Sequence, residues 1–110
     1  LHASLTVREV LSFAVALRSW RSSQQARELR VLHVLRRLGL EDVADSRLGG
    51  QGRGISGGER RRTAVGVELV ACRRVLVLDE PTSGLDAVSA VALSKLLAEL
   101  AEEGRVVIAC

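Results

Sequence analysis

The chain has 110 residues, a formal net charge of +3 and 47% hydrophobic residues, with Phe13 and Trp20 as its aromatic side chains. The basic residues are dispersed among acidic ones and aromatics for stacking on bases are scarce, so the composition argues against nucleic-acid binding. Cys72 and Cys110 lack the spacing of a metal site or a disulfide framework, which favours a reducing cytosol, and no apolar stretch reaches the roughly 20 residues of a membrane-spanning helix.

The first helix is predicted from a capping box, in which a Thr and a Glu three residues later bond each other's backbone amides. Thr6 and Glu9 have this spacing, so the helix should begin at Val7 and run to about Trp20. A polar stretch, residues 21–25, links it to a second helix that Gly39 ends. Apolar side chains recur in that helix at three- and four-residue spacings, at Leu29, Val31, Leu32, Leu35 and Leu38.

The second half of the chain has the pattern of a helix, a strand, a helix and a strand. A capping box at Ser56 and Glu59 begins the third helix. Residues 75–78 are uniformly apolar, as in a strand buried on both faces of a parallel sheet. Asp86 can cap a last helix that Gly104 ends, before the strand-like run 106–109. We expect the buried helix sides to be Ala64, Val65, Leu69 and Val70 in the third helix and Val88, Val91, Ala92, Leu96 and Leu100 in the last.

The length and order of residues 75–109 predict a right-handed βαβ unit, and therefore an open α/β sheet. We expect a helical subdomain over residues 1–71, including the third helix, and part of an α/β core over residues 72–110. The chain has no methionine, opens on Leu1 and ends at Cys110, directly after the strand-like run 106–109. We therefore interpret it as part of a longer protein.

Six of the ten glycines fall within residues 49–58, before and at the start of the third helix. A helix start carries backbone amides without intrahelical partners and the positive end of the helix dipole, which together suit a phosphate. Ser56 adds a hydroxyl, and Gly57 and Gly58 have no Cβ to keep a phosphate away. An ordinary Ser-capped helix behind a glycine-rich loop shares this pattern, so the loop has a structural explanation as well.

Asp79 and Glu80 directly follow residues 75–78, at the carboxyl end where open α/β sheets place ligands. Strand alternation would point the two side chains in opposite directions and give them different roles. Asp79 suits a magnesium ion held through water, and Glu80 suits a base that orients or deprotonates a water for attack on a γ-phosphate. A plain acidic turn is the alternative. No Gly-x-x-x-x-Gly-Lys-Ser/Thr loop occurs in the chain to grip the other phosphates.

A γ-phosphate site and a water-positioning acid without the main phosphate loop resemble part of the ATP-binding cassette (ABC), an α/β fold of the P-loop NTPase type. Residues 55–59, Ile-Ser-Gly-Gly-Glu, resemble the signature motif of the cassette. Residues 75–80 resemble its second nucleotide motif, and residues 83–86, Ser-Gly-Leu-Asp, resemble its D-loop. Four segments are similar in sequence to the G subfamily, the White-type half-transporters: residues 5–9, 54–62, 66–70 and 81–86. The resemblance spans nearly the whole chain.

The resemblance implies a role for each matching residue. In the family two cassettes close head to tail, so Ser56 and Gly58, with Gly57 between them, would bind the γ-phosphate of ATP held by the opposite subunit. Asp79 would serve Mg²⁺ and Glu80 would be the catalytic residue for the ATP of their own subunit. The D-loop residues that would communicate across the dimer are Ser83 and Asp86. The phosphate loop of the family lies upstream of Leu1 and its switch histidine beyond Cys110, so this stretch alone should not hydrolyse ATP.

The implied function is ATP hydrolysis that energises a membrane transporter for lipid, sterol or xenobiotic export, with ATP and Mg²⁺ as cofactors. The implied partners are a second cassette, identical or different, and the membrane domain of the same polypeptide, contacted through the helical subdomain. The implied location is a membrane, with this region on the cytoplasmic face. Two alternatives stay open: a soluble ABC-type ATPase of DNA repair or chromosome structure, and a truncated, non-catalytic cassette.

Three further features have structural explanations. His2 is terminal and His33 lies within a helix, and neither follows a strand as a switch histidine would. The run Arg60, Arg61 and Arg62 is a candidate for lipid phosphates. On the first turns of a helix, a solvated face or pairing with Glu59 is the better interpretation, and we assign these arginines no site role.

Overall fold

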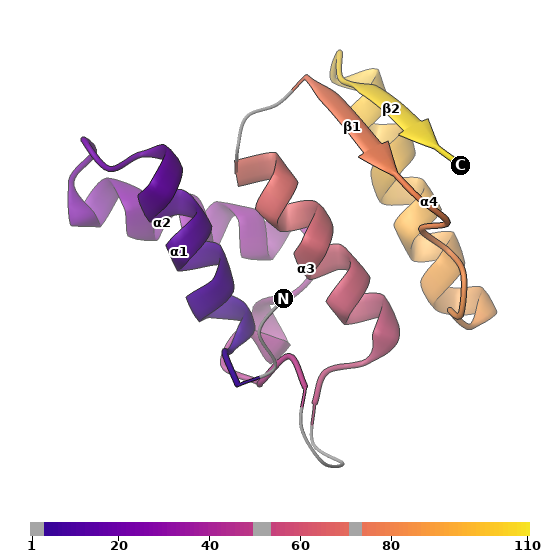
Figure 1. Ribbon diagram of the computed structural model, residues 1–110, viewed down its shortest axis with the longest axis horizontal. Coiled ribbons are helices and arrows are strands. Elements are labelled where there is room, and N and C mark those ends of the chain that lie inside the picture. The colour runs from indigo at the N-terminus through magenta and orange to yellow at the C-terminus, as the bar shows by residue number, and fades with distance from the viewer. Residues whose placement is uncertain (1–3, 50–53, 71–73) are drawn as a thin grey trace.

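The computed structural model describes residues 4–49, 54–70 and 74–110; His2 and Cys72 lie outside these ranges. The elements in chain order are α1 (Val7–Arg18), α2 (Gln24–Arg37), the short 3₁₀ turn η1 (Glu41–Val43), α3 (Gly57–Val70), β1 (Val75–Leu78), α4 (Ala87–Glu102) and β2 (Val106–Ala109). Figure 1 shows α3 between the α1–α2 pair and a unit made of β1, β2 and α4. The expected order of elements is confirmed, with η1 as an addition.

Caps set the start of α1 and both ends of α2. Helix α1 ends at Arg18, slightly before the expected Trp20, and α2 begins at Gln24, inside the polar stretch expected to be the linker. The Thr6 hydroxyl accepts from the Glu9 amide and the Glu9 carboxylate accepts from the Thr6 amide, each at 3.1 Å, so the capping box is confirmed. The side chain of Ser23 caps α2 in the same way. At the other end of α2, Gly39 has a φ of +66°, a left-handed conformation that glycine adopts without strain.

Gly66 lets α3 lie close to both α1 and α2. A Cβ at Gly66 would lie 2.5 Å from Leu38 Cδ1 and 3.1 Å from Leu11 Cδ2, so no larger residue fits without displacing α1 or α2. The Thr63 side chain is fully buried and its hydroxyl donates to the Glu59 carbonyl at 2.8 Å. Ala64 is exposed, so the expectation that it is buried was wrong. The buried residues of α3 are Gly58, Thr63, Val65, Gly66, Leu69 and Val70.

The two strands form a parallel pair, as expected, in the register that runs from Val75 opposite Val106 to Leu78 opposite Ala109. Leu76 is buried, whereas Val75 and Val77 are 50% and 68% exposed. Within the described chain β1 is therefore covered on one face, and the prediction of burial on both faces is wrong here.

The inner face of α4 also differs from the sequence prediction. Val88, Val91 and Ala92 are exposed, while Leu96 and Leu100 are buried as expected. Because apolar residues occur around most of this helix, their spacing alone does not select the packed face. The buried residues of α4 are Leu93, Leu96, Leu97 and Leu100.

One hydrophobic core runs through the molecule, from Val7 and Leu11 in α1 to Leu97 and Leu100 in α4. Most of its residues come from α1, α2, α3, β1 and α4, so it joins the α1–α2 pair to the βαβ unit across α3. Figure 1 shows α3 lying between these two parts. Among the described residues no helix combines the length and the apolar character needed to cross a membrane. Cys110 is a free, exposed thiol directly after β2.

Candidate functional site

The start of α3, residues 56–58, is here called the signature start. The Ser56 hydroxyl accepts from the Glu59 amide at 3.1 Å, and Glu59 Oε1 accepts from the Ser56 amide at 2.8 Å, so this capping box is confirmed as well. The amides of Gly57 and Gly58 come earlier in the first turn and have no intrahelical acceptor. Ser56 and Gly57 are exposed. The Ser56 hydroxyl still has its own proton to donate, so the signature start presents donors at a positive helix end.

The signature start packs against the polar segment that follows β1, residues 79–86, here called the acidic turn, and against the first turn of α4. A Cβ at Gly57 would lie 3.5 Å from Leu85 Cδ2, an ordinary contact. A Cβ at Gly58 would lie 2.9 Å from both Cβ and Oγ of Ser89. Gly58 therefore sets how closely α3 approaches the start of α4. The fold brings together two motifs that the sequence places apart.

The contact at Gly58 predicts that Gly58→Ala lowers the free energy of unfolding by about 1–3 kcal/mol, because Ser89 Cβ is attached to the helix backbone and cannot swing away. Thermal or urea unfolding measures the change. Gly57→Ala is the matched control and should have a much smaller effect, since its new Cβ meets Leu85 at contact distance. Removing the neighbour with Ser89→Gly should recover part of the loss in the double variant, and strict additivity of the two changes would contradict the argument.

The backbone of Glu80 is held in an unusual conformation at the start of the acidic turn. Its φ is +44°, a left-handed value that side chains other than glycine rarely adopt and that is common at functional sites. Its amide donates to the Cys110 carbonyl at 2.7 Å and its carbonyl accepts from the Ser83 amide at 3.0 Å. Strand β1 ends at Leu78. The alternation argument therefore does not extend to Asp79 and Glu80, and the different roles of the two side chains stay a prediction.

Arg61 was missed by the sequence analysis. Its Nη1 donates to the Glu80 carbonyl at 3.1 Å and its Nη2 donates to the Ser83 carbonyl at 3.0 Å. Its neighbour Arg60 donates to the Leu48 carbonyl at 2.5 Å. A solvated face or pairing with Glu59 was the expectation, yet Arg60 and Arg61 bind main-chain oxygens at least twelve residues away in the sequence. Nothing in the sequence of residues 60–62 indicates which backbone carbonyls these arginines bind.

Asp86 occupies the N-cap position of α4 with an extended backbone, as predicted, but its carboxylate makes no capping hydrogen bond of good geometry. The Ser89 hydroxyl, and then the nearby helix-start amides, nonetheless lower the pKa of Asp86, while partial desolvation opposes them. Gly84, with a φ of +76°, allows the chain to turn between Ser83 and Asp86. Ser83 is exposed and is tied to Arg61 through its carbonyl.

Asp79 is exposed directly after β1. Over the ranges that the structure describes, no group of three or more His, Cys, Asp or Glu side chains is arranged to hold a metal. A single carboxylate still fits Mg²⁺, which proteins commonly bind through one or two carboxylates together with water and substrate phosphates. His33 is exposed within α2 and contributes nothing to this region.

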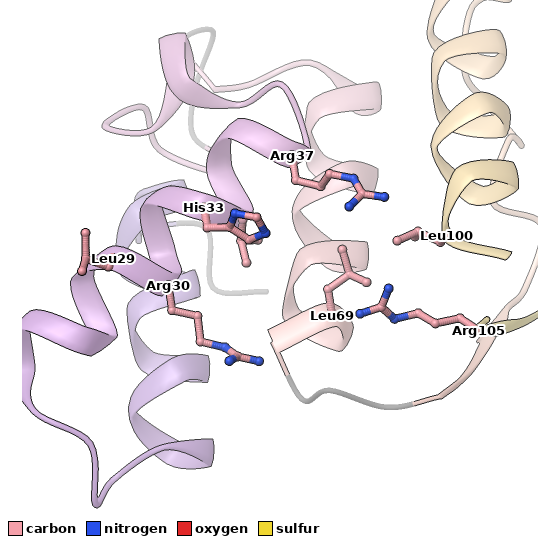
Figure 2. Close-up of a pocket in the computed structure, with 8 residues that line it drawn as sticks. Leu29, Arg30, His33, Arg37, Leu69, Leu100 and Arg105 are labelled. Atoms are coloured by element: carbon pink, nitrogen blue, oxygen red, sulfur yellow. The ribbon is translucent and has the colours of Figure 1, made fainter. Parts of the chain in front are cut away.

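A separate cavity of about 470 Å³ lies where α2, α3 and the end of α4 meet. Figure 2 shows Arg37, from α2, and Arg105, from the connection between α4 and β2, reaching into it. Both arginines pair with Glu103, at 2.6 and 3.1 Å. The cavity is lined by Leu29, Arg30, His33, Val34, Arg37, Leu69, Leu100 and Arg105, none of which belongs to the signature start or the acidic turn.

Known proteins share much of this sequence. A family model described as ABC transporter matches residues 1–83. The mouse (Mus musculus) broad substrate specificity ATP-binding cassette transporter ABCG2 is 47% identical over 107 residues, which cover 96% of this chain and 16% of that protein. Human ATP-binding cassette sub-family G member 8 is 48% identical over 107 residues, covering 96% of this chain and 16% of that protein. ABC transporter G family member 6 of Arabidopsis thaliana is 46% identical over 106 residues, covering 94% and 15%.

The chain therefore spans about one sixth of the length of these relatives. Its helices and parallel strand pair are consistent with part of the α/β fold of P-loop NTPases, to which the matched family belongs. The family match over residues 1–83, and the identity to G-type members over nearly the whole chain, show that this chain belongs to the ABC transporter family and is of the ABCG type.

Proposed function

We propose that this chain is part of an ATP-binding and ATP-hydrolysing module that energises a membrane transporter exporting lipid, sterol or xenobiotic molecules. The observation that carries the proposal is the packing of the signature start against the acidic turn, through Gly57 beside Leu85 and Gly58 beside Ser89. This packing fixes the signature start, which would act on the ATP of an opposite subunit, relative to the acidic turn, whose Asp79 and Glu80 would act on the ATP of their own subunit. The names of the relatives, all ABC transporters, support transport over DNA repair or chromosome structure.

Each residue has a role in this proposal. Asp79 would hold Mg²⁺ through water and Glu80 would orient or deprotonate the attacking water, both for the ATP of their own subunit. The signature start, which is exposed at Ser56 and Gly57, would bind the γ-phosphate of ATP in an opposite subunit, through the Ser56 hydroxyl and the Gly57 and Gly58 amides. When bound, Mg²⁺ supplies positive charge against the phosphate oxygens. Ser83 and Asp86 would transmit the closure across the dimer.

Two partners follow from the proposal. The first partner is a second cassette, identical or different. The signature start is exposed at Ser56 and Gly57 and would bind ATP held by another subunit, so two subunits are needed to complete each ATP site. The membrane domain of the same polypeptide would contact the helical subdomain, residues 1–71, from the cytoplasmic side. A groove of about 840 Å³ between α1 and α2 supports this contact, since Phe13 and Leu29 line it and are 59% and 61% exposed.

The proposal is tested by the requirement of the full-length protein for Mg²⁺. In membrane vesicles the protein should release phosphate from ATP, and chelation of Mg²⁺ with EDTA should lower the rate to background, with recovery when excess Mg²⁺ is restored. ATP hydrolysis that continues at the same rate under chelation would contradict the role of Asp79. A full-length protein that folds, binds ATP and never hydrolyses it would instead favour the non-catalytic alternative.

A further inference from the structure

Arg61 connects the helix of the signature start to the acidic turn. It lies on α3, little more than one turn beyond Ser56, and its two terminal nitrogens donate to the carbonyls of Glu80 and Ser83 at 3.1 and 3.0 Å. The Ser83 amide donates to the same Glu80 carbonyl at 3.0 Å, which makes residues 80–83 a hydrogen-bonded turn. Arg61 therefore binds both ends of this turn at once.

The turn needs such support because Glu80 has a left-handed backbone at φ +44°. A non-glycine residue persists in that region when surrounding contacts hold it there. The Cys110 carbonyl holds the Glu80 amide from the side of β2, and Arg61 holds the Glu80 carbonyl from the side of α3. Without Arg61 the Glu80 carbonyl keeps only the bond from the Ser83 amide within the turn, and the direction in which Glu80 projects its carboxylate is less restricted.

The chemistry of the contact suits arginine in particular. A guanidinium is planar and carries several donors in a fixed fork, so it can reach two carbonyl oxygens together, whereas a lysine ammonium acts as a single compact charge. Arg61 is partly exposed, and its partners are main-chain atoms that no side-chain substitution in the turn removes. Its effect on Glu80 is therefore positional rather than a direct action on phosphate.

We propose that Arg61 is a positioning residue for ATP hydrolysis: by binding the carbonyls of Glu80 and Ser83 it places the Glu80 carboxylate and ties that placement to the position of Ser56 on the same helix. The proposal rests on the proposed function, because it assumes that Glu80 acts on ATP. A shift of α3 when a partner nucleotide engages the signature start is passed through Arg61 to the turn that carries Glu80.

The test uses the full-length protein in vesicles and compares Arg61→Met, Arg61→Lys and the wild type. Arg61→Met should lower kcat for ATP about 10- to 100-fold, since small misplacements of a reacting group have effects of this size. KM for ATP should change less than about threefold, because no contact with bound ATP is removed. Arg61→Lys should fall between the two, as it keeps the charge and one of the two contacts.

Arg36→Met is the matched control, because Arg36 forms an exposed ion pair with Glu41 at the far end of α2 and should leave kcat unchanged. Wild-type kcat in Arg61→Met, with or without a raised KM, would overturn the positioning role of Arg61. If Glu80→Gln is inactive in the same assay, the proposed function still stands. Full hydrolysis by Glu80→Gln would overturn both. The positioning role is supported if kcat falls in Arg61→Met, falls less in Arg61→Lys, and is lost in Glu80→Gln.

Discussion

Glu80→Gln in the full-length protein is expected to bind ATP and fail to turn it over. The amide has nearly the shape of the carboxylate, but it cannot take a proton from the attacking water. Loss of a general base costs roughly 100- to 10,000-fold in rate, so hydrolysis should fall to background. The substitution should leave the fold intact, because Glu80 is held through its backbone by Cys110, Ser83 and Arg61.

Phosphate release and retention of labelled nucleotide measure this outcome together. The variant should accumulate unhydrolysed ATP, since closure no longer leads to cleavage. Glu41→Gln makes the same chemical change at an exposed carboxylate paired with Arg36 and is expected to behave as the wild type. Undiminished hydrolysis in Glu80→Gln would remove Glu80 from the catalytic role and would leave Asp79 as the remaining acidic candidate of the turn.

Most of the features that the sequence predicted are decided by neighbours three or four residues away. The capping boxes at Thr6 and Ser56 form as predicted, because the partner of each cap lies within the first turn of its helix. The helix ends at Gly39 and Gly104 follow from the left-handed backbone, with φ values of +66° and +93°. The parallel pairing of β1 with β2 follows from the length of the segment between them.

The features that the sequence did not predict depend on tertiary contacts. The packed face of α4 is set by what lies beside it, and Val88 and Val91 are as apolar as the leucines that are buried instead. The bond from Arg61 to Glu80 joins residues from two elements, and its acceptor is a carbonyl that every residue has. The residue type of the acceptor therefore gives no indication that this hydrogen bond forms. The left-handed backbone of Glu80 has the same origin, since contacts from β2 and α3 hold it.

Ser56→Arg should stop turnover in the full-length protein while ATP still binds to the same subunit. Ser56 is exposed at the signature start, so a long side chain is accommodated outside the fold and occupies the space that the ATP of an opposite subunit would enter. Loss of the hydroxyl donor alone would cost about 100-fold or more if it acts on charge that develops in the transition state. The added bulk should prevent the two cassettes from closing at all.

Ser56→Ala separates the two effects. It removes the hydroxyl and the cap to the Glu59 amide, a loss of about 1 kcal/mol in stability, but adds no bulk. Turnover should therefore fall less than in Ser56→Arg, whereas binding of a fluorescent ATP analogue should match the wild type in both. Equal turnover in Ser56→Arg and the wild type would mean that ATP is hydrolysed without contact to the signature start. The donors of α3 would then be those of an ordinary capped helix.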